Sequence, residues 1–249
     1  MAKFQIINGK GIIPQGTTEI PNQAFENCNN LTIIEIPSSV MIIGGYAFAG
    51  CTSLISIKIP DSVMVVQANA FAGCTGLTEI EFMWDVMEIG PSAFEDCTGL
   101  RSVVFHRDVM KIEQSAFRRC SSLTNIEFKG DVMKFADFAF QDCTGLTNIV
   151  IPSSVSDLRA SAFIGCTGVE TIRFNGLVVC DMYWLIKDIM IADEGGDRFG
   201  FGARVRHGRL EKILVPKGWG NFYTKLIKGP SELIKEGDEE RYIELIEEV

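Results

Sequence analysis

Residues 77–99 read LTEIEFMWDVMEIGPSAFEDCTG, and residues 100–122 read LRSVVFHRDVMKIEQSAFRRCSS. Both stretches open on leucine, and both carry an Ala-Phe pair that is followed three residues later by cysteine. That cysteine recurs every 23 residues, at Cys28, Cys51, Cys74, Cys97, Cys120, Cys143 and Cys166. A period this strict predicts one supersecondary unit stacked on copies of itself.

The apolar residues of each unit predict a short strand, a second buried pair and a turn. After Leu77, Ile80 and Phe82 alternate with glutamates, which is the pattern of a strand with one buried face. Copies of this strand, one per turn, would pair as a parallel sheet. Val86 and Ile89 form the second pair. The spacing of Ala-Phe-x-x-Cys-x-x-Leu predicts a helical turn. Its candidate caps are Ser92, Ser115 and Ser161.

No single unit can bury these apolar faces, so stacking must supply the core. We expect the phenylalanines from Phe25 to Phe163 to form one continuous spine. The cysteines are expected to be small buried residues, because neither disulfide frameworks nor the paired spacings of zinc sites match one cysteine per turn.

The pattern Leu-x-x-Ile-x-Ile-Pro-x-x-Val-x-x-Ile-x-x-x-Ala-Phe-x-x-Cys resembles the BspA-like leucine-rich repeat family, and units 31–53 and 146–168 match it almost completely. The resemblance implies an α/β-type repeat solenoid, a right-handed superhelix of seven 23-residue repeats with a parallel concave β-sheet and a cap at each end. It also implies a protein that binds other proteins, often at the surface of host-associated bacteria. No catalytic residues come with the family.

Three regions are expected: an N-terminal cap at 1–12, the solenoid at 13–174 and a C-terminal capping region at 175–249. The period fails near Asn175. Residues 177–190 are apolar enough to cover the last repeat, and residues 231–248 predict an acidic helix. The glycines of 195–202 do not match phosphate-binding spacings, which favours a loop or hairpin there.

Charge and hydropathy narrow the classes of partner and the location. A net charge of −9 and a pI near 4.9 argue against nucleic acid and anionic membranes, which attract clustered Lys and Arg. No apolar run reaches the roughly 18–20 residues of a transmembrane segment. The first ten residues lack the apolar stretch of a signal peptide. We therefore expect a cytoplasmic protein, or a cell-surface or secreted one if an export signal has been removed.

Little in the sequence indicates an enzyme. Its two histidines, His106 and His207, lie far apart, and the motifs of metalloproteases, nucleophile elbows and CxxC pairs are absent from the sequence. Glu79 and Glu81 share one strand face, but Glu127 lies two turns further on, about 10 Å away, too far for a coupled carboxylate pair. We expect no catalytic residue, no cofactor and no metal.

The outward residues of the predicted sheet favour a non-enzymatic scaffold that binds a protein or peptide through its concave face. These positions vary between units while the inward ones hardly change. The candidate partner-binding residues are Glu79, Glu81, Trp84, Val104, His106, Asn125 and Glu127. Trp84 suits an interface anchor. The alternative is that Trp84 packs over its turn.

A ladder of methionines suggests a second class of function. Methionine stands ten residues after the leucine in five units, at Met41, Met64, Met87, Met110 and Met133. If exposed, the ladder is an apolar stripe roughly 20 Å long, suited to a partner or to a homo-oligomer. The alternative function is thus a self-assembling structural or surface-adhesion element that uses this stripe or the cap edges. A simpler interpretation is that repeat duplication copied a tolerated residue.

Overall fold

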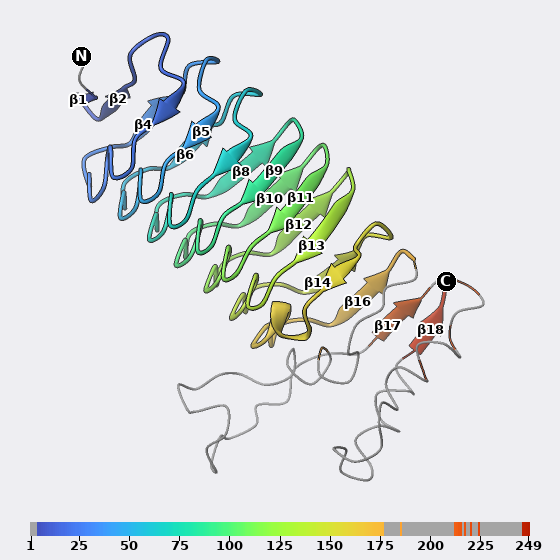
Figure 1. The fold of residues 1–249 in the computed structure, drawn as a ribbon. Helices are drawn as coiled ribbons and strands as arrows, with labels where there is room; N and C mark the ends of the chain where they lie inside the picture. Colours follow the sequence, from blue (N-terminus) through green and yellow to red (C-terminus); the bar gives the residue numbers. More distant parts are fainter. Residues whose placement is uncertain are drawn as a thin grey trace.

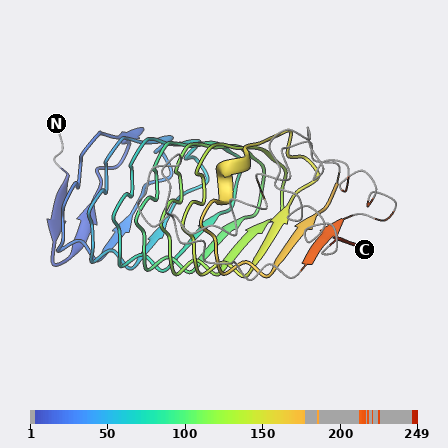
Figure 2. The ribbon, with the colours of Figure 1, turned by 90° about the horizontal axis from the view of Figure 1, so that it is seen from below.

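The computed structural model describes residues 4–176, 185, 212–215, 217, 220, 224 and 246–249. This part of the chain forms a solenoid of about seven turns made of short strands and tight turns (Figure 1). The turns follow one another along one axis, and the two ends of the chain lie at opposite ends of the stack (Figure 2).

The predicted parallel sheet is present and forms one side of the solenoid. Its strands, in sheet order, are β1 (Gln5–Ile7), β2 (Lys10–Ile12), β4 (Ile33–Glu35), β6 (Ser56–Lys58), β8 (Glu79–Phe82), β10 (Ser102–Phe105) and β12 (Asn125–Phe128). Only β1 is antiparallel to its neighbour. Val103 of β10 lies opposite Ile80 and Ile126, so neighbours in the sheet are one 23-residue period apart. We call this the first sheet.

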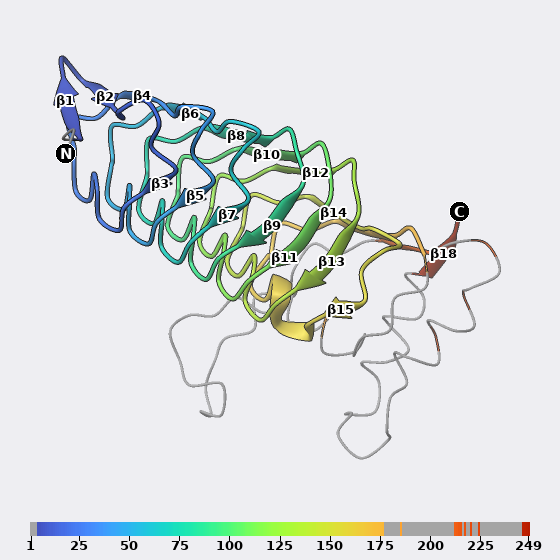
Figure 3. The same ribbon diagram turned by 45° about the horizontal axis from the view of Figure 1, so that its top comes forward.

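A second parallel sheet runs along the stack where the sequence indicated only a buried pair (Figure 3). Its strands are β3 (Glu19–Ile20), β5 (Ile42–Ile43), β7 (Val65–Val66), β9 (Val86–Ile89), β11 (Val109–Ile112), β13 (Val132–Phe135) and β15 (Asp157–Leu158). Val86 and Ile89 of β9 are buried, while Met87 and Glu88 between them face outward. In β9, β11 and β13 the buried pair therefore marks the two ends of a strand, whereas a shorter strand such as β5 contains only the second member of the pair.

A third sheet continues the stack, with the strands β14 (Asn148–Ile151), β16 (Thr171–Phe174), β17 (Lys212–Val215) and β18 (Ile246–Glu248). Residues 246–248 are thus a strand, and the expectation of a helix through residue 248 is wrong there. Leu185 is buried against the core. The rest of the predicted cover at 177–190, the loop at 195–202 and His207 lie outside the described residues.

The predicted phenylalanine spine is confirmed. Seven rings, one per turn from Phe25 to Phe163, stack with centroids 5.0–5.4 Å apart and interplanar angles of 3–9°. A second, shorter stack joins Phe82, Phe105 and Phe128 at the ends of the first-sheet strands. Centroid separations of about 5 Å follow from the spacing of about 4.8 Å between paired strands, because each ring is one turn from the next.

In the first six units the predicted helical turn is not formed, because its backbone N–H groups alternate between two kinds of partner. Those of Gln23, Phe25 and Asn27 donate to carbonyls 22 residues ahead, in the next turn, at 2.7–2.9 Å. Those between them, on Ala24, Glu26 and Cys28, donate to carbonyls three residues back. An α-helix requires every N–H to bond four residues back within its own segment. Half of these N–H groups bond the next turn instead, so no α-helix forms.

This alternation requires left-handed backbone at two residues of each turn. Gln23 and Asn27 have φ of 61° and 58°, and the same two positions recur up the stack. Ser92 and Ser115 occupy the first of these positions, with φ of 53° and 58°, so they are not the predicted helix caps. The described residues contain one 3-10 helix, Ala160–Phe163, in which Ser161 lies inside and bonds the Asp137 carboxylate.

Six of the seven periodic cysteines are buried as predicted and their thiols also donate hydrogen bonds, whereas Cys28 is only partly buried. In six turns the Sγ atom lies 3.0–3.2 Å from the phenylalanine carbonyl of the preceding turn. The donors are Cys51, Cys74, Cys97, Cys120, Cys143 and Cys166. Cysteine thus combines the packing of a small apolar side chain with a weak S–H donor, which alanine lacks.

Phe94→Ala should lower the free energy of unfolding by about 3–5 kcal/mol, because it leaves a cavity in the spine. Phe94 is fully buried and stacks on Phe71 and Phe117. Urea denaturation followed by circular dichroism measures the loss. The exposed Thr98→Ala in the same turn is the control, with an expected change within about 0.5 kcal/mol. A loss below about 1 kcal/mol for Phe94→Ala would contradict a closely packed spine.

Iodoacetamide at pH 8 should modify Cys28 of the native protein much faster than the six cysteines above it. Burial raises the pKa of the Cys28 thiol, but this side chain is only half-buried, whereas burial raises the pKa of Cys51 to about 12. A raised pKa lowers the fraction of reactive thiolate, and burial blocks access to it. Peptide mass spectrometry measures each rate, with the protein in urea as control. Equal rates in the native state would show that the turns open readily.

Candidate protein-interaction site

Five of the predicted site residues share the exposed face of the first sheet. Glu79 and Asn125 lie in one row across the strands, on either side of Ser102. Glu81 and Glu127 lie in the next row, on either side of Val104. The inward residues between these rows, such as Ile80 and Val103, are buried. The structure therefore places these five side chains together on one surface, while their role in binding stays a prediction.

His106 links this surface into a chain of charged groups. Its Nε2 atom is 3.7 Å from Glu81 Oε2, and its Nδ1 atom is 3.4 Å from Lys129 Nζ. Lys129 in turn lies 3.9 Å from Glu127. Lys129 was not among the predicted residues, although it stands one period after His106. All four groups are partly exposed, so each pair contributes at most about 1 kcal/mol to stability.

Trp84 packs over the neighbouring turn and remains half-buried. Its indole Nε1 donates a 2.6 Å hydrogen bond to the Val63 carbonyl, and its ring meets Phe82 edge-on at 6.4 Å. The polar end of the indole is therefore satisfied within the protein, as a buried tryptophan requires. Packing over the turn accounts for this geometry, and a role as an interface anchor stays a prediction.

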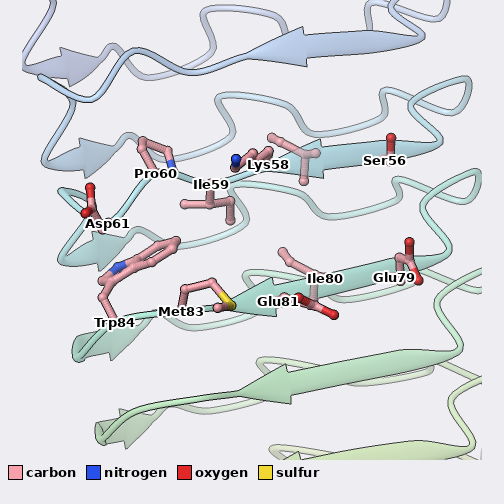
Figure 4. A pocket seen from close by; sticks show the side chains of 11 residues that line it. Ser56, Lys58, Ile59, Pro60, Asp61, Glu79, Ile80, Glu81, Met83 and Trp84 are labelled. Carbon is pink, nitrogen blue, oxygen red and sulfur yellow. The ribbon is translucent and has the colours of Figure 1, made fainter.

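A shallow hollow of about 680 Å³ opens beside Trp84, between β6 and β8 (Figure 4). Buried isoleucines line it, namely Ile57, Ile59 and Ile80. The side chains of Lys58, Asp61, Glu79 and Glu81 stand around it. The exposed Met83 and the ring of Trp84 form its far wall, and the indole extends toward the turn that carries Pro60 and Asp61.

The hollow lies where two kinds of unit meet. Earlier units end their first strand in Ile-Pro, as at Ile59-Pro60, whereas the next three end it in phenylalanine, as at Phe82. β8 and β10 pair at four positions, but β6 and β8 pair only at Ser56 and Glu79. The ladder thus stops short of the strand ends, and the hollow occupies that opening. The change from Ile-Pro to Phe is its signal in the sequence.

The hollow carries an excess of negative charge. Asp61, Glu79 and Glu81 bring three carboxylates, and Lys58 brings one ammonium group. Glu81 faces His106 on its far side. Among the described residues no cation forms an ion pair with Asp61 or Glu79, so both carboxylates are open to an added positive charge.

The methionine ladder is exposed along the second sheet. Each of its five side chains is 45–47% accessible. Backbone bonds join consecutive members, as from Met64 to Met41 and from Met87 to Met64. The same ladder of bonds continues to Thr18 before Met41 and to Ser156 after Met133. The methionines therefore form an apolar stripe with a polar residue at each end.

Among the described residues, no group of three or more His, Cys, Asp or Glu side chains is placed to hold a metal ion. Within the same residues, no helix has the length and apolar character needed to cross a membrane.

Several solved structures of bacterial leucine-rich repeat proteins are similar to this chain. A Bacteroides ovatus protein is 20% identical, with a TM-score of 0.41, over 82% of this chain and 62% of its own. A leucine rich cell surface protein of Faecalibacterium prausnitzii is 22% identical, with a TM-score of 0.33, over 63% and 57%. A Treponema pallidum (T. pallidum) leucine-rich repeat protein is 28% identical, with a TM-score of 0.27, over 63% and 51%. The chain thus covers less than two thirds of each.

Comparison with curated proteins finds no significant match. The family model described as a BspA type leucine rich repeat region matches residues 8–120 and 87–180, with six copies. These matches span well over half of the chain and include every turn that carries the period. The chain therefore belongs to the BspA-type leucine-rich repeat family.

Proposed function

We propose that this protein is a non-catalytic scaffold that binds another protein through the exposed face of its first sheet. The observation that carries the proposal is the contrast between the two faces of that sheet. Inward positions repeat from turn to turn, as in Ile34, Ile57 and Ile80. The exposed row beside them changes from Lys58 to Glu81. Uniform packing builds the frame, so the exposed residues are free to differ.

The rigidity of the frame also supports binding. Strands β8, β10 and β12 pair at four positions each, and stacked phenylalanines lie beneath their ends. The backbone of such strands loses little freedom when a partner docks, which lowers the entropic cost of association. Residues on rigid elements can also be held at fixed distances from one another. Glu79, Glu81, Val104, Asn125 and Glu127 share this support.

A photo-crosslinking amino acid at Val104 or Asn125 should capture the same protein from extracts of the organism that makes this chain. Lys111, exposed on β11 of the second sheet, is the control position and should not capture it. Mass spectrometry identifies the product. Asn125→Arg should then weaken binding of the purified partner by about 30-fold, as expected for a central interface residue. Thr98→Arg, on an exposed turn, should leave it unchanged. Equal capture at all three positions would reject the first sheet as the interface.

The exposed methionine ladder supports a second candidate function, self-association through the second sheet. Unbranched, polarizable side chains adapt to many partner surfaces. Five of them in a row, each almost half exposed, form a larger apolar patch than scattered surface residues do. A second copy of the chain would present the same stripe, so two copies could bury both stripes in a symmetric contact.

If this second function holds, the protein should form dimers that a Met64→Lys, Met87→Lys, Met110→Lys variant cannot form. The substitutions place three ammonium groups on the stripe, and each would lose its hydration in the contact. Analytical ultracentrifugation over a range of concentrations measures the mass. The control carries Thr52→Lys, Thr75→Lys and Thr98→Lys on exposed turns and should still dimerise. A wild-type protein that stays monomeric at high concentration would exclude self-association.

A further inference from the structure

We propose that the hollow between β6 and β8 binds an arginine or lysine side chain from a segment of the protein partner. This inference rests on the proposed function and specifies the chemistry of its contact. The hollow combines an apolar lining with carboxylates around it, and such a site matches a side chain with a long apolar stem and a cationic head.

The apolar lining suits the stem of the side chain. Ile57, Ile59 and Ile80 are buried members of the core at the bottom of the hollow. Met83, which is 53% exposed, and the half-buried Trp84 stand at one side. The methylene groups of arginine or lysine would cover apolar atoms that now face water, which is favourable because it removes apolar surface from water.

The carboxylates suit the cationic head. Asp61, Glu79 and Glu81 come from two neighbouring turns and line the hollow, with Asp61 near one end of it and Glu79 near the other (Figure 4). Lys58 offsets one of these charges, so the group carries a net negative charge. Among the described residues, Asp61 and Glu79 have no ion pair to break before a new cation binds. Guanidinium is the better fit of the two cations, because its planar fork can bond carboxylates in pairs and can stack on an aromatic ring.

Trp84 packs over its turn and, in addition, forms one wall of the hollow. Its N–H is engaged by the Val63 carbonyl, and this bond holds the ring across the opening of the ladder. A cation near the face of a tryptophan ring is attracted by the ring quadrupole. The hydrogen bond therefore fixes an aromatic wall at the end of the hollow where Asp61 lies, with Glu79 at the other end (Figure 4).

A random peptide library displayed on phage, panned on the wild-type protein, tests the proposal. The enriched peptides are then measured on Glu79→Gln, Glu81→Gln, a variant with nearly unchanged side-chain shape and two fewer charges, which should bind them about tenfold more weakly or worse. These peptides should share an arginine or lysine. Melting followed by circular dichroism should show that the variant remains folded, because both side chains are exposed.

Synthetic copies of the enriched peptides then identify the contact. Replacing the shared arginine by citrulline, which removes the charge and keeps the shape, should weaken binding to the wild type by about tenfold or more in fluorescence polarisation. A shared lysine is replaced by norleucine. Either replacement should have less than about a twofold effect on the Gln variant, because the partner charges are already absent. The matched control, Glu19→Gln with Glu88→Gln on the second sheet, should behave as the wild type.

Three outcomes would overturn the inference in distinguishable ways. Enriched peptides without a cationic residue would show that the hollow prefers another chemistry. Cationic peptides that bind the Gln variant normally would show that their charge is recognised elsewhere. If they nevertheless lose binding to Asn125→Arg, the proposed function stands and only the hollow is rejected. If no peptide depends on any first-sheet residue, the proposed function fails and the inference fails with it.

Discussion

Each described turn takes many of its backbone hydrogen-bond partners from the turns on either side, and this constraint determines the rest of the structure. The N–H groups of Phe25 and Asn27 bond carbonyls of the next turn, whereas that of Met64 bonds a carbonyl of the preceding turn. Since a buried N–H without a partner is costly, each turn must have the same length as its neighbours. This requirement explains why the period in the sequence is always 23 residues. The stacked phenylalanines and the thiol donors follow from the same register.

The inward positions were predictable from the sequence because burial depends on periodicity, which is visible there. Ile80, Phe94 and Cys97 are buried as expected, and the strands of the first sheet lie where alternation placed them. The prediction of a helical turn was wrong in the first six units, because the spacing of the apolar residues does not determine which carbonyl each N–H group bonds. Ser92 illustrates the difficulty: a serine before Ala-Phe matches a helix cap, yet its backbone is left-handed. Carbonyls of the next turn, 22 residues ahead, accept hydrogen bonds from these N–H groups, and this prevents a helix.

The candidate site was predictable only in part. Alternation along each strand placed Glu79, Glu81 and Glu127 on the exposed face, and the structure agrees. The hollow could not be found in this way, because it arises between units and belongs to no single one. Neither the bond from Trp84 to Val63 nor the contact of His106 with Lys129 has a signature within one repeat. Each becomes visible only when consecutive units are laid side by side.

Three borders separate Ile-Pro units from phenylalanine units, and at the last of them Ile151 of β14 still pairs with Phe174 of β16. The other two explain why specific chemistry can arise on so regular a frame. Within the phenylalanine block, His106 N–H bonds the Phe82 carbonyl and Lys129 N–H bonds that of Phe105. Pro152 stands at the next such position and has no N–H, and β12 and β14 belong to different sheets. The second sheet pairs across both borders, so the stack stays joined while the first sheet opens. Identical turns fill each other's gaps completely. The border between β6 and β8 leaves a space of its own shape and charge, and such a space can distinguish one partner from another.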